Sequence, residues 1–254
     1  MKKMKAFSAV LIFILSFTSF SLAEDKFEAF TNSVGMKMIL LPAGQFTMGS
    51  WSGEKGRTHD EFAHEVIISK PFYIASTEVT QKQWKEIMGF ENCNFKGDSL
   101  PVEKVSWQQA MEFCRKLSEK ENKNYTLPSE AQWEYACRGG SQDSFAGGLN
   151  LDETGWYFDN SENITHAVGT KKANSWGLYD MHGNVAEWCL DNYQSDYPQE
   201  QVTDPAGPVE GKHKVFRGGA WSHFDRAARC SARSCAPASY QLKYVGFRVT
   251  IQAE

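Results

Sequence analysis

One segment, residues 177–188, constrains the fold of this chain more than any other part of its sequence. It combines a glycine turn, two carboxylates and two aromatic anchors within twelve residues. Carboxylate oxygens and backbone carbonyls are the hard ligands that suit calcium. The segment therefore predicts a turn held by a structural calcium ion, with four ligand residues: Asp180, Gly183, Val185 and Glu187.

Two other interpretations of this segment stay open. A carboxylate can cap the turn at Gly183-Asn184 without any ion. His182, in the same turn, can bind a transition metal, although a lone histidine in a turn is more often a surface or hydrogen-bonded residue.

The N-terminus has the pattern of an export signal. Three lysines within Met1-Lys2-Lys3-Met4-Lys5 precede an apolar run over residues 6–22, and Ser21-Leu22-Ala23 forms a small-residue cleavage site before Glu24. The pattern predicts a signal peptide over 1–23, a mature domain over 24–254 and an exported protein, periplasmic or secreted. A membrane anchor is the alternative, but the apolar core is short for a span. Glu24 stands where a lipid anchor needs cysteine.

Charge excludes several classes of partner. Because Lys2, Lys3 and Lys5 belong to the leader, the formal charge falls from −4 for the whole chain to −7 for the mature part. An acidic chain without a basic block is a poor ligand for nucleic acid or for an anionic membrane. We therefore expect no nucleic-acid partner and no membrane span after cleavage. No Pro/Gly/Ser linker divides residues 24–254, which favours one domain.

Six cysteines belong to the mature part, and an oxidising compartment favours disulfides between them. No C-x-x-C motif occurs, so a zinc knuckle or a thioredoxin-type site has little support. Spacing alone leaves about fifteen connectivities open. The six are Cys93, Cys114, Cys137, Cys189, Cys230 and Cys235.

Three capping boxes predict three helices. They start at Thr80, Ser106 and Ser129, and a glutamine stands three residues after each. Short strands are expected at residues 38–41, 45–48, 65–69, 72–76, 215–217 and 246–251. Residues 139–176 show no sustained period, which predicts long ordered loops held by disulfides or an ion.

An ordered series of motifs resembles the formylglycine-generating enzyme family, also called sulfatase-modifying factors. The series covers almost the whole mature chain, from about residue 30 to residue 251. Besides residues 177–188 it contains Gly44-Gln45-Phe46-Thr47-Met48-Gly49, Glu78-Val79-Thr80, Pro101-Val102-Glu103, Leu127-Pro128-Ser129-Glu130-Ala131-Gln132-Trp133-Glu134-Tyr135, Arg217-Gly218-Gly219-Ala220-Trp221 and Gly246-Phe247-Arg248.

The resemblance implies a fold and two stabilising devices. The fold is a single α+β domain of the C-type-lectin-like, sulfatase-modifying-factor kind, poor in regular structure. The family binds a structural calcium at the four positions given above, with asparagine where this chain has Asp180. It also implies a disulfide between Cys137 and Cys230. The other four cysteines have no connectivity that the resemblance assigns.

The same resemblance identifies a loss at the active centre. Relatives that convert a substrate cysteine to formylglycine hold copper(I) with two cysteines that follow the Gly-Gly-x-aromatic turn, and soft thiolates suit that ion. Here the first position aligns with His223, and the second falls on Ala228 or Asp225, depending on the direction of counting. Cys230 and Cys235 imitate the spacing of such a pair, so a shifted catalytic pair is the alternative to the Cys137–Cys230 disulfide.

Candidate catalytic residues therefore gather after Trp221. They are His223, Asp225 and Arg226, with Arg229 nearby. A histidine with a carboxylate two residues away can act as a general base or a metal ligand. The same cluster also fits a polar groove lined by arginines that binds a peptide or a carboxylate-bearing ligand.

Three functions follow from these patterns. The first is an exported domain without oxidase chemistry, which acts as a binding or maturation accessory factor for an exported protein or peptide. The second is a divergent metal- and oxygen-dependent oxidoreductase of the non-haem iron or metabolite-maturation type, with iron or copper as its metal and His223 near its centre. The third, formylglycine formation on sulfatases, is disfavoured because the thiolate pair is missing.

Overall fold

Three capping boxes start the long helices of the protein, as predicted. The computed structural model describes residues 27–148 and 150–253, so the predicted signal peptide lies outside the described part. Each cap side chain accepts a hydrogen bond from the amide of the third helical residue, a glutamine. The side chain of that glutamine in turn accepts a hydrogen bond from the amide of the cap residue. The helices are α1 (Gln81–Met88), α2 (Trp107–Glu121) and α3 (Glu130–Arg138), and each ends at a left-handed residue: Gly89, Asn122 or Gly139.

Three small sheets carry the strands. The five-stranded sheet has the antiparallel order β1-β2-β5-β12-β6, the four-stranded sheet has the order β10-β9-β7-β11, and the three-stranded sheet has the order β3-β4-β8. The bounds are β1 (Ala29–Thr31), β2 (Lys37–Leu41), β3 (Gly44–Met48), β4 (His64–Ile68), β5 (Phe72–Ala75), β6 (Tyr125–Thr126), β7 (Ala186–Asn192), β8 (Val202–Thr203), β9 (Lys214–Arg217), β10 (Arg233–Ala236), β11 (Val245–Gly246) and β12 (Thr250–Gln252).

The strand predictions are confirmed with one exception and one large omission. The strand expected at 246–251 is divided between β11 and β12, which belong to different sheets. The omission is β7, which was not predicted: it contains Glu187 and Asp191, charged residues that are usually exposed but are buried here. Among the described residues of 139–176, the regular elements are the short helix α4 (Leu151–Thr154) and the 3₁₀ turn η1 (Ala146–Gly148), as expected for long loops.

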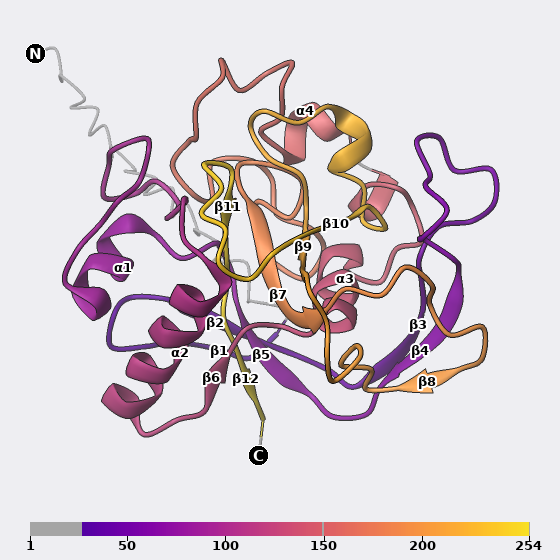
Figure 1. Cartoon of the computed structure of the whole chain (residues 1–254), viewed down its shortest axis with the longest axis horizontal. Coiled ribbons are helices and arrows are strands. Elements are labelled where there is room, and N and C mark those ends of the chain that lie inside the picture. The colour runs from indigo at the N-terminus through magenta and orange to yellow at the C-terminus, as the bar shows by residue number, and fades with distance from the viewer. Residues whose placement is uncertain (1–26, 149, 254) are drawn as a thin grey trace, which may run out of the picture.

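Aromatic side chains fill the core between these elements. Trp84 of α1 stacks on Phe113 of α2 with ring centroids 5.7 Å apart, and Phe247 packs edge-on against both rings. A second cluster surrounds Trp133 of α3 and Trp176. Figure 1 shows α1 and α2 at the left, the β3–β4 hairpin and β8 at the right, and α3 between them.

Buried ion pairs join α3 to the four-stranded sheet. Arg217 of β9 contacts Glu130 and Glu134, and Glu134 also binds Arg138. Arg233 of β10 donates to Glu130 at 2.7 Å. These charges are paired and almost completely removed from solvent, so α3 and the two strands are held in one fixed arrangement. None of the helices in the described part of the chain is long and apolar enough to cross a membrane.

Candidate functional site

A tight turn after β9 presents the predicted site residues. Gly218 and Gly219 have φ values of +95° and +69°, which favour glycine. A Cβ on Gly219 would lie 2.9 Å from the carbonyl oxygen of Ala227. The two glycines therefore let the chain at Trp221 lie directly against the segment that follows His223.

Trp221 is fixed from several sides. Its amide donates to the carbonyl of Asn184 at 2.9 Å, and its own carbonyl accepts the Ser161 hydroxyl at 2.7 Å. Its ring meets the ring of Phe95 edge-on at 5.3 Å. Residues 177–188 and the loop of residues 139–176 thus both hold the turn in place.

His223 lies half-buried beside this tryptophan. Its ring meets that of Tyr244 edge-on, with centroids 4.7 Å apart. Desolvation by burial lowers the pKa of His223, so the imidazole is neutral at pH 7. Within the described residues, no hydrogen bond to either ring nitrogen of His223 is formed.

The structure does not bring Asp225 to His223. Asp225 and Arg226 lie in the exposed 3₁₀ turn η2 (Asp225–Ala227), where the Asp225 carboxylate accepts the Arg226 amide at 2.7 Å. In the described part of the chain no hydrogen bond joins Asp225 to the imidazole of His223. Arg229 is buried and donates to Glu54 and Glu61. Arg226 is therefore the arginine that faces solvent near His223, whereas Arg229 belongs to the interior.

An exposed aromatic pair borders the turn, and sequence reasoning did not identify it. Phe158 and Phe224 are 43% and 54% exposed, and their rings lie 4.9 Å apart. The Phe158 amide donates to the carbonyl of His223 at 2.9 Å, which attaches the pair to the candidate site. Phe158 comes from the aperiodic segment 139–176, so no pattern pointed to it.

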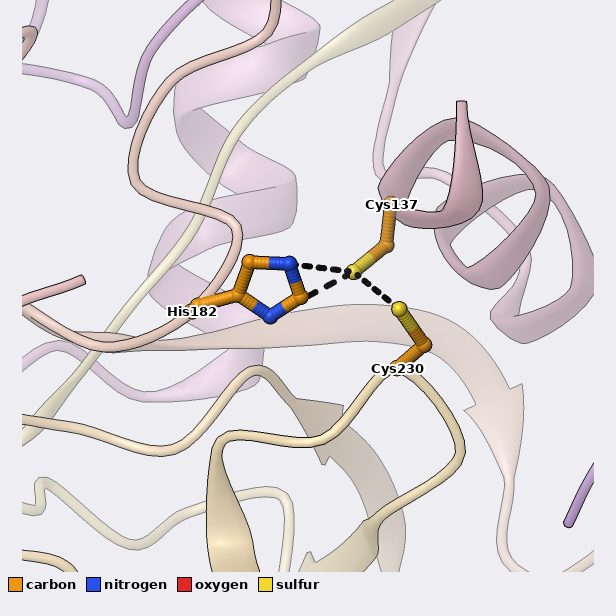
Figure 2. Close-up of side chains that lie close together, drawn as sticks. All are labelled: Cys137, His182 and Cys230. Carbon is orange, nitrogen blue, oxygen red and sulfur yellow. Dashed lines mark hydrogen bonds between the residues drawn. The ribbon is translucent and has the colours of Figure 1, made fainter. Parts of the chain in front are cut away.

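The sulfur atoms of Cys137 and Cys230 lie 3.5 Å apart in the interior. Cys137 comes from α3, and Cys230 follows η2 (Figure 2). Both side chains are fully buried, and desolvation raises the pKa of the Cys137 thiol. The predicted disulfide partners are therefore adjacent, and the cystine stays a prediction. Cys230 faces Cys137 and not Cys235, which lies on β10.

His182 completes a group of three possible metal ligands with these two cysteines. Both nitrogens of its ring are already used: Nδ1 donates to the Ala228 carbonyl at 2.7 Å, and Nε2 accepts the Ala146 amide at 3.1 Å. Desolvation by burial lowers the pKa of His182 to about 4, so the ring is neutral. A metal would have to displace one of these bonds, which favours a disulfide beside a structural histidine.

The four predicted calcium ligands are buried: Asp180, Gly183 and Val185 belong to the turn before β7, and Glu187 lies at the start of that strand. The two carboxylates have different partners. Glu187 accepts two bonds of 2.6 Å from Arg248 and one of 2.8 Å from Trp133. Asp180 accepts the Gly169 amide at 2.7 Å through Oδ2, whereas its buried Oδ1 has no partner. The orphaned Asp180 oxygen fits a cation, while the Glu187 carboxylate is already engaged.

Glu78 adds a carboxylate that sequence reasoning did not include. Its carboxylate is close enough to Asp180 for each charge to act on the other, and it accepts the Val185 amide at 3.3 Å. Desolvation, then the charges of Asp180 and Glu187, raise the pKa of Glu78 well above its usual range. Three buried carboxylates face one guanidinium, so the group needs a proton or a cation for balance. A calcium ion held by Asp180 and the carbonyls of Gly183 and Val185 would meet that need, and the calcium site stays a prediction.

Calcium should therefore stabilise the protein against heat. At a hundredfold excess over Kd, we expect the Tm of chelator-treated protein to rise by roughly 5–10 °C. Asp180→Gly should abolish this response, because glycine accepts the φ of +58° at this position but offers no ligand. The exposed Asp98→Asn is the matched control. If the Tm did not change with calcium but rose on acidification, a proton and not a cation would balance the charges of the three carboxylates.

Comparisons with known proteins relate the chain to one family of sequences. A sequence profile described as "Sulfatase-modifying factor enzyme 1-like domain" matches residues 24–253. "Chaperone protein LppX" of Paenibacillus barcinonensis is 31% identical over 242 residues, which cover 74% of this chain and 80% of that protein. "Formylglycine-generating enzyme" of Mus musculus is 28% identical over 249 residues, which cover 91% of this chain.

The chain spans 64% of the mouse enzyme, slightly less than two thirds of its length. Among solved structures, "Treponema denticola variable protein 1" superposes with a TM-score of 0.81 at 29% identity. That match covers 89% of this chain and 99% of the Treponema chain. The likeness therefore extends over the whole described domain.

Proposed function

The chain belongs to the sulfatase-modifying factor family, and on that basis we propose that it binds exported proteins without oxidising a cysteine. The α+β, C-type-lectin-like fold predicted from the sequence is confirmed. In this proposal the protein is exported and acts as an accessory factor for the maturation of envelope or secreted proteins. One observation carries it: the turn after β9 presents His223 and exposed aromatic rings, and no thiol.

Oxidase chemistry lacks its ligands at this turn. Copper(I) is held by soft thiolates, and residues 221–229 contain no cysteine. The next thiol in the chain, Cys230, is fully buried against Cys137. A copper(I) ion of the kind that relatives use has no thiolate pair at the surface of this turn.

Binding has a physical basis at the same place. Phe158 and Phe224 expose neighbouring rings, and the exposed Arg226 follows Phe224 by two residues in the chain. Clustered aromatic rings with an arginine are typical of surfaces that bind polypeptide. The chaperone name of the Paenibacillus relative supports this function. The occupant that we propose is an extended segment of a partly folded exported protein, with an apolar side chain on the two rings.

Removal of the aromatic pair should weaken such binding. We expect Phe158→Ser/Phe224→Ser to bind a fluorescent apolar peptide roughly tenfold more weakly, equivalent to a loss of about 1.4 kcal/mol. Fluorescence anisotropy would measure the Kd, with the similarly exposed Phe90→Ser as the control. Equal affinities for the double variant and the wild type would overturn the assignment of this surface.

The divergent oxidoreductase is the second candidate, because His223 is neutral and its ring nitrogens have no partner among the described residues. Such an imidazole is available to a metal ion. Metal analysis of protein from its own host separates the two candidates. Stoichiometric iron or copper that is lost in His223→Gln would contradict the binding proposal, whereas metal-free protein supports it.

A further inference from the structure

A separate cavity of about 230 Å³ opens where the end of β7 meets the start of α3. Its lining includes Asp191 at the end of β7, Glu130 at the start of α3 and the segment 205–208. It shares no lining residue with the turn around Trp221 and His223. No role for this cavity follows from the family's catalytic or calcium positions described above.

Asp191 is the unusual group in this cavity, because it is 4% exposed and has no counter-ion. Its carboxylate accepts the Glu130 amide at 2.8 Å. Within residues 27–148 and 150–253, no side chain forms a hydrogen bond or salt bridge with it. Lys214 is the cation whose charge acts on Asp191, but its ammonium donates to the Leu190 carbonyl and lies over the Trp107 ring. Desolvation, then the charge of Glu130, raises the pKa of Asp191 to about 7.

The other buried charges of the lining already neutralise one another. Glu130 accepts bonds from Arg217 and Arg233 and from the hydroxyl of Tyr197. Arg233 is therefore committed to Glu130 and does not reach Asp191. At the exposed edge, Asp196 adds a second negative charge. The cavity thus has an excess of negative charge, with one buried carboxylate that is open to a ligand.

The walls around this carboxylate are mostly apolar and stiff. They contain Pro198, Pro205 and Pro208, which have no amide proton to offer a ligand. Gly207 has a φ of +67°, and a Cβ there would lie 3.2 Å from Asp191 Oδ1. This glycine lets the loop pass close over the carboxylate. An apolar cleft with one fixed polar anchor is the usual form of a small-molecule site.

We propose that this cavity binds an alkylammonium group, with the ammonium on the Asp191 carboxylate and the alkyl stem between the prolines. A buried carboxylate without a counter-ion favours a cationic ligand, because the attraction between the two charges offsets the free-energy cost of removing both from water. An alkyl stem removes water from the proline walls. The ammonium belongs either to a free amine or to a lysine side chain of a bound polypeptide. This inference does not depend on the proposed function of the His223 turn.

Calorimetric titration of the full mature protein at pH 8 tests the proposal. The probes are 1,5-diaminopentane and an Nα-acetyl-lysine amide, with 1-pentanol and pentanoate as the neutral and anionic counterparts. We expect both ammonium probes to bind at least tenfold more tightly than either counterpart. Tighter binding of the diamine would identify a free amine as the source, and tighter binding of the lysine amide a polypeptide.

Two variants make the result specific to the cavity. Asp191→Asn still accepts the Glu130 amide but carries no charge, and Ala206→Phe fills the cavity with Asp191 intact. Each should weaken diamine binding at least tenfold, while the exposed Asp98→Asn should leave it unchanged. The proposal would be overturned if pentanol bound as tightly as the diamine, or if neither ammonium probe bound. It would also be overturned if either cavity variant bound the diamine as tightly as the wild type does.

Discussion

Arg248→Met should lower the free energy of unfolding by about 3–5 kcal/mol, because it leaves a buried carboxylate without its counter-ion. Arg248 is completely buried and donates two bonds of 2.6 Å to Glu187. It also donates to the carbonyls of Ala75 and Tyr179. Glu78 and Asp180 lie beside the pair, so the loss of the guanidinium exposes three carboxylates to one another's charge.

Urea denaturation at fixed free calcium measures this effect. The double variant Glu187→Gln/Arg248→Met should recover part of the lost stability, because it removes the stranded charge as well as the arginine. Arg115→Met is the surface control: Arg115 is 53% exposed and pairs with Glu112 and Glu119, so its loss should leave the stability nearly unchanged. Similar losses for Arg248→Met and Arg115→Met would show that the buried pair has no special role.

A disulfide between Cys137 and Cys230 should be the second large contribution to stability. The two residues are 93 positions apart, and closing a loop of this length is worth about 4–5 kcal/mol in the chain-entropy model. Cys137→Ala/Cys230→Ala should lose most of that amount relative to oxidised wild type. Under reducing conditions the wild type should lose a comparable part. Denaturant unfolding with and without reductant measures both changes.

Cys235→Ala is the matched control, because Cys235 lies on β10 and has no described sulfur partner. Peptide mapping without reductant should recover the fragments of Cys137 and Cys230 joined to each other. Two free thiols in freshly exported protein would contradict the disulfide. Bound zinc that is lost when His182 is replaced would show a metal site in its place.

Local signals predicted the helices well. Each capping box is complete within four residues, so the positions of Thr80, Ser106 and Ser129 were enough to locate α1, α2 and α3. The signal for β7 was absent for a physical reason. Glu187 and Asp191 are charged residues of the kind that usually lie at the surface, and their burial in β7 depends on partners from distant segments, such as Arg248 for Glu187.

The candidate site was predicted in part. Sequence located His223 because it aligns with a position that is cysteine in formylglycine-forming relatives. Contacts between distant segments could not be predicted in the same way. Glu78 and Asp180 lie close together in the fold although roughly a hundred positions separate them in the chain. Arg248 donates to both carboxylate oxygens of Glu187. Phe158 reaches the site through one backbone bond from an aperiodic loop. Such neighbours depend on tertiary packing and leave no periodic trace.

The absence of cysteine oxidation at the His223 turn is tested most directly by incubating the mature protein with copper(I), oxygen and a sulfatase-type Cys-x-Pro-x-Arg peptide. A formylglycine-generating enzyme that retains both catalytic cysteines serves as the positive control. Because residues 221–229 offer no thiolate to copper, we expect the peptide to remain a thiol in mass spectra while the control converts it. Appearance of the aldehyde with this protein would contradict the proposed binding function and show that the protein oxidises cysteine.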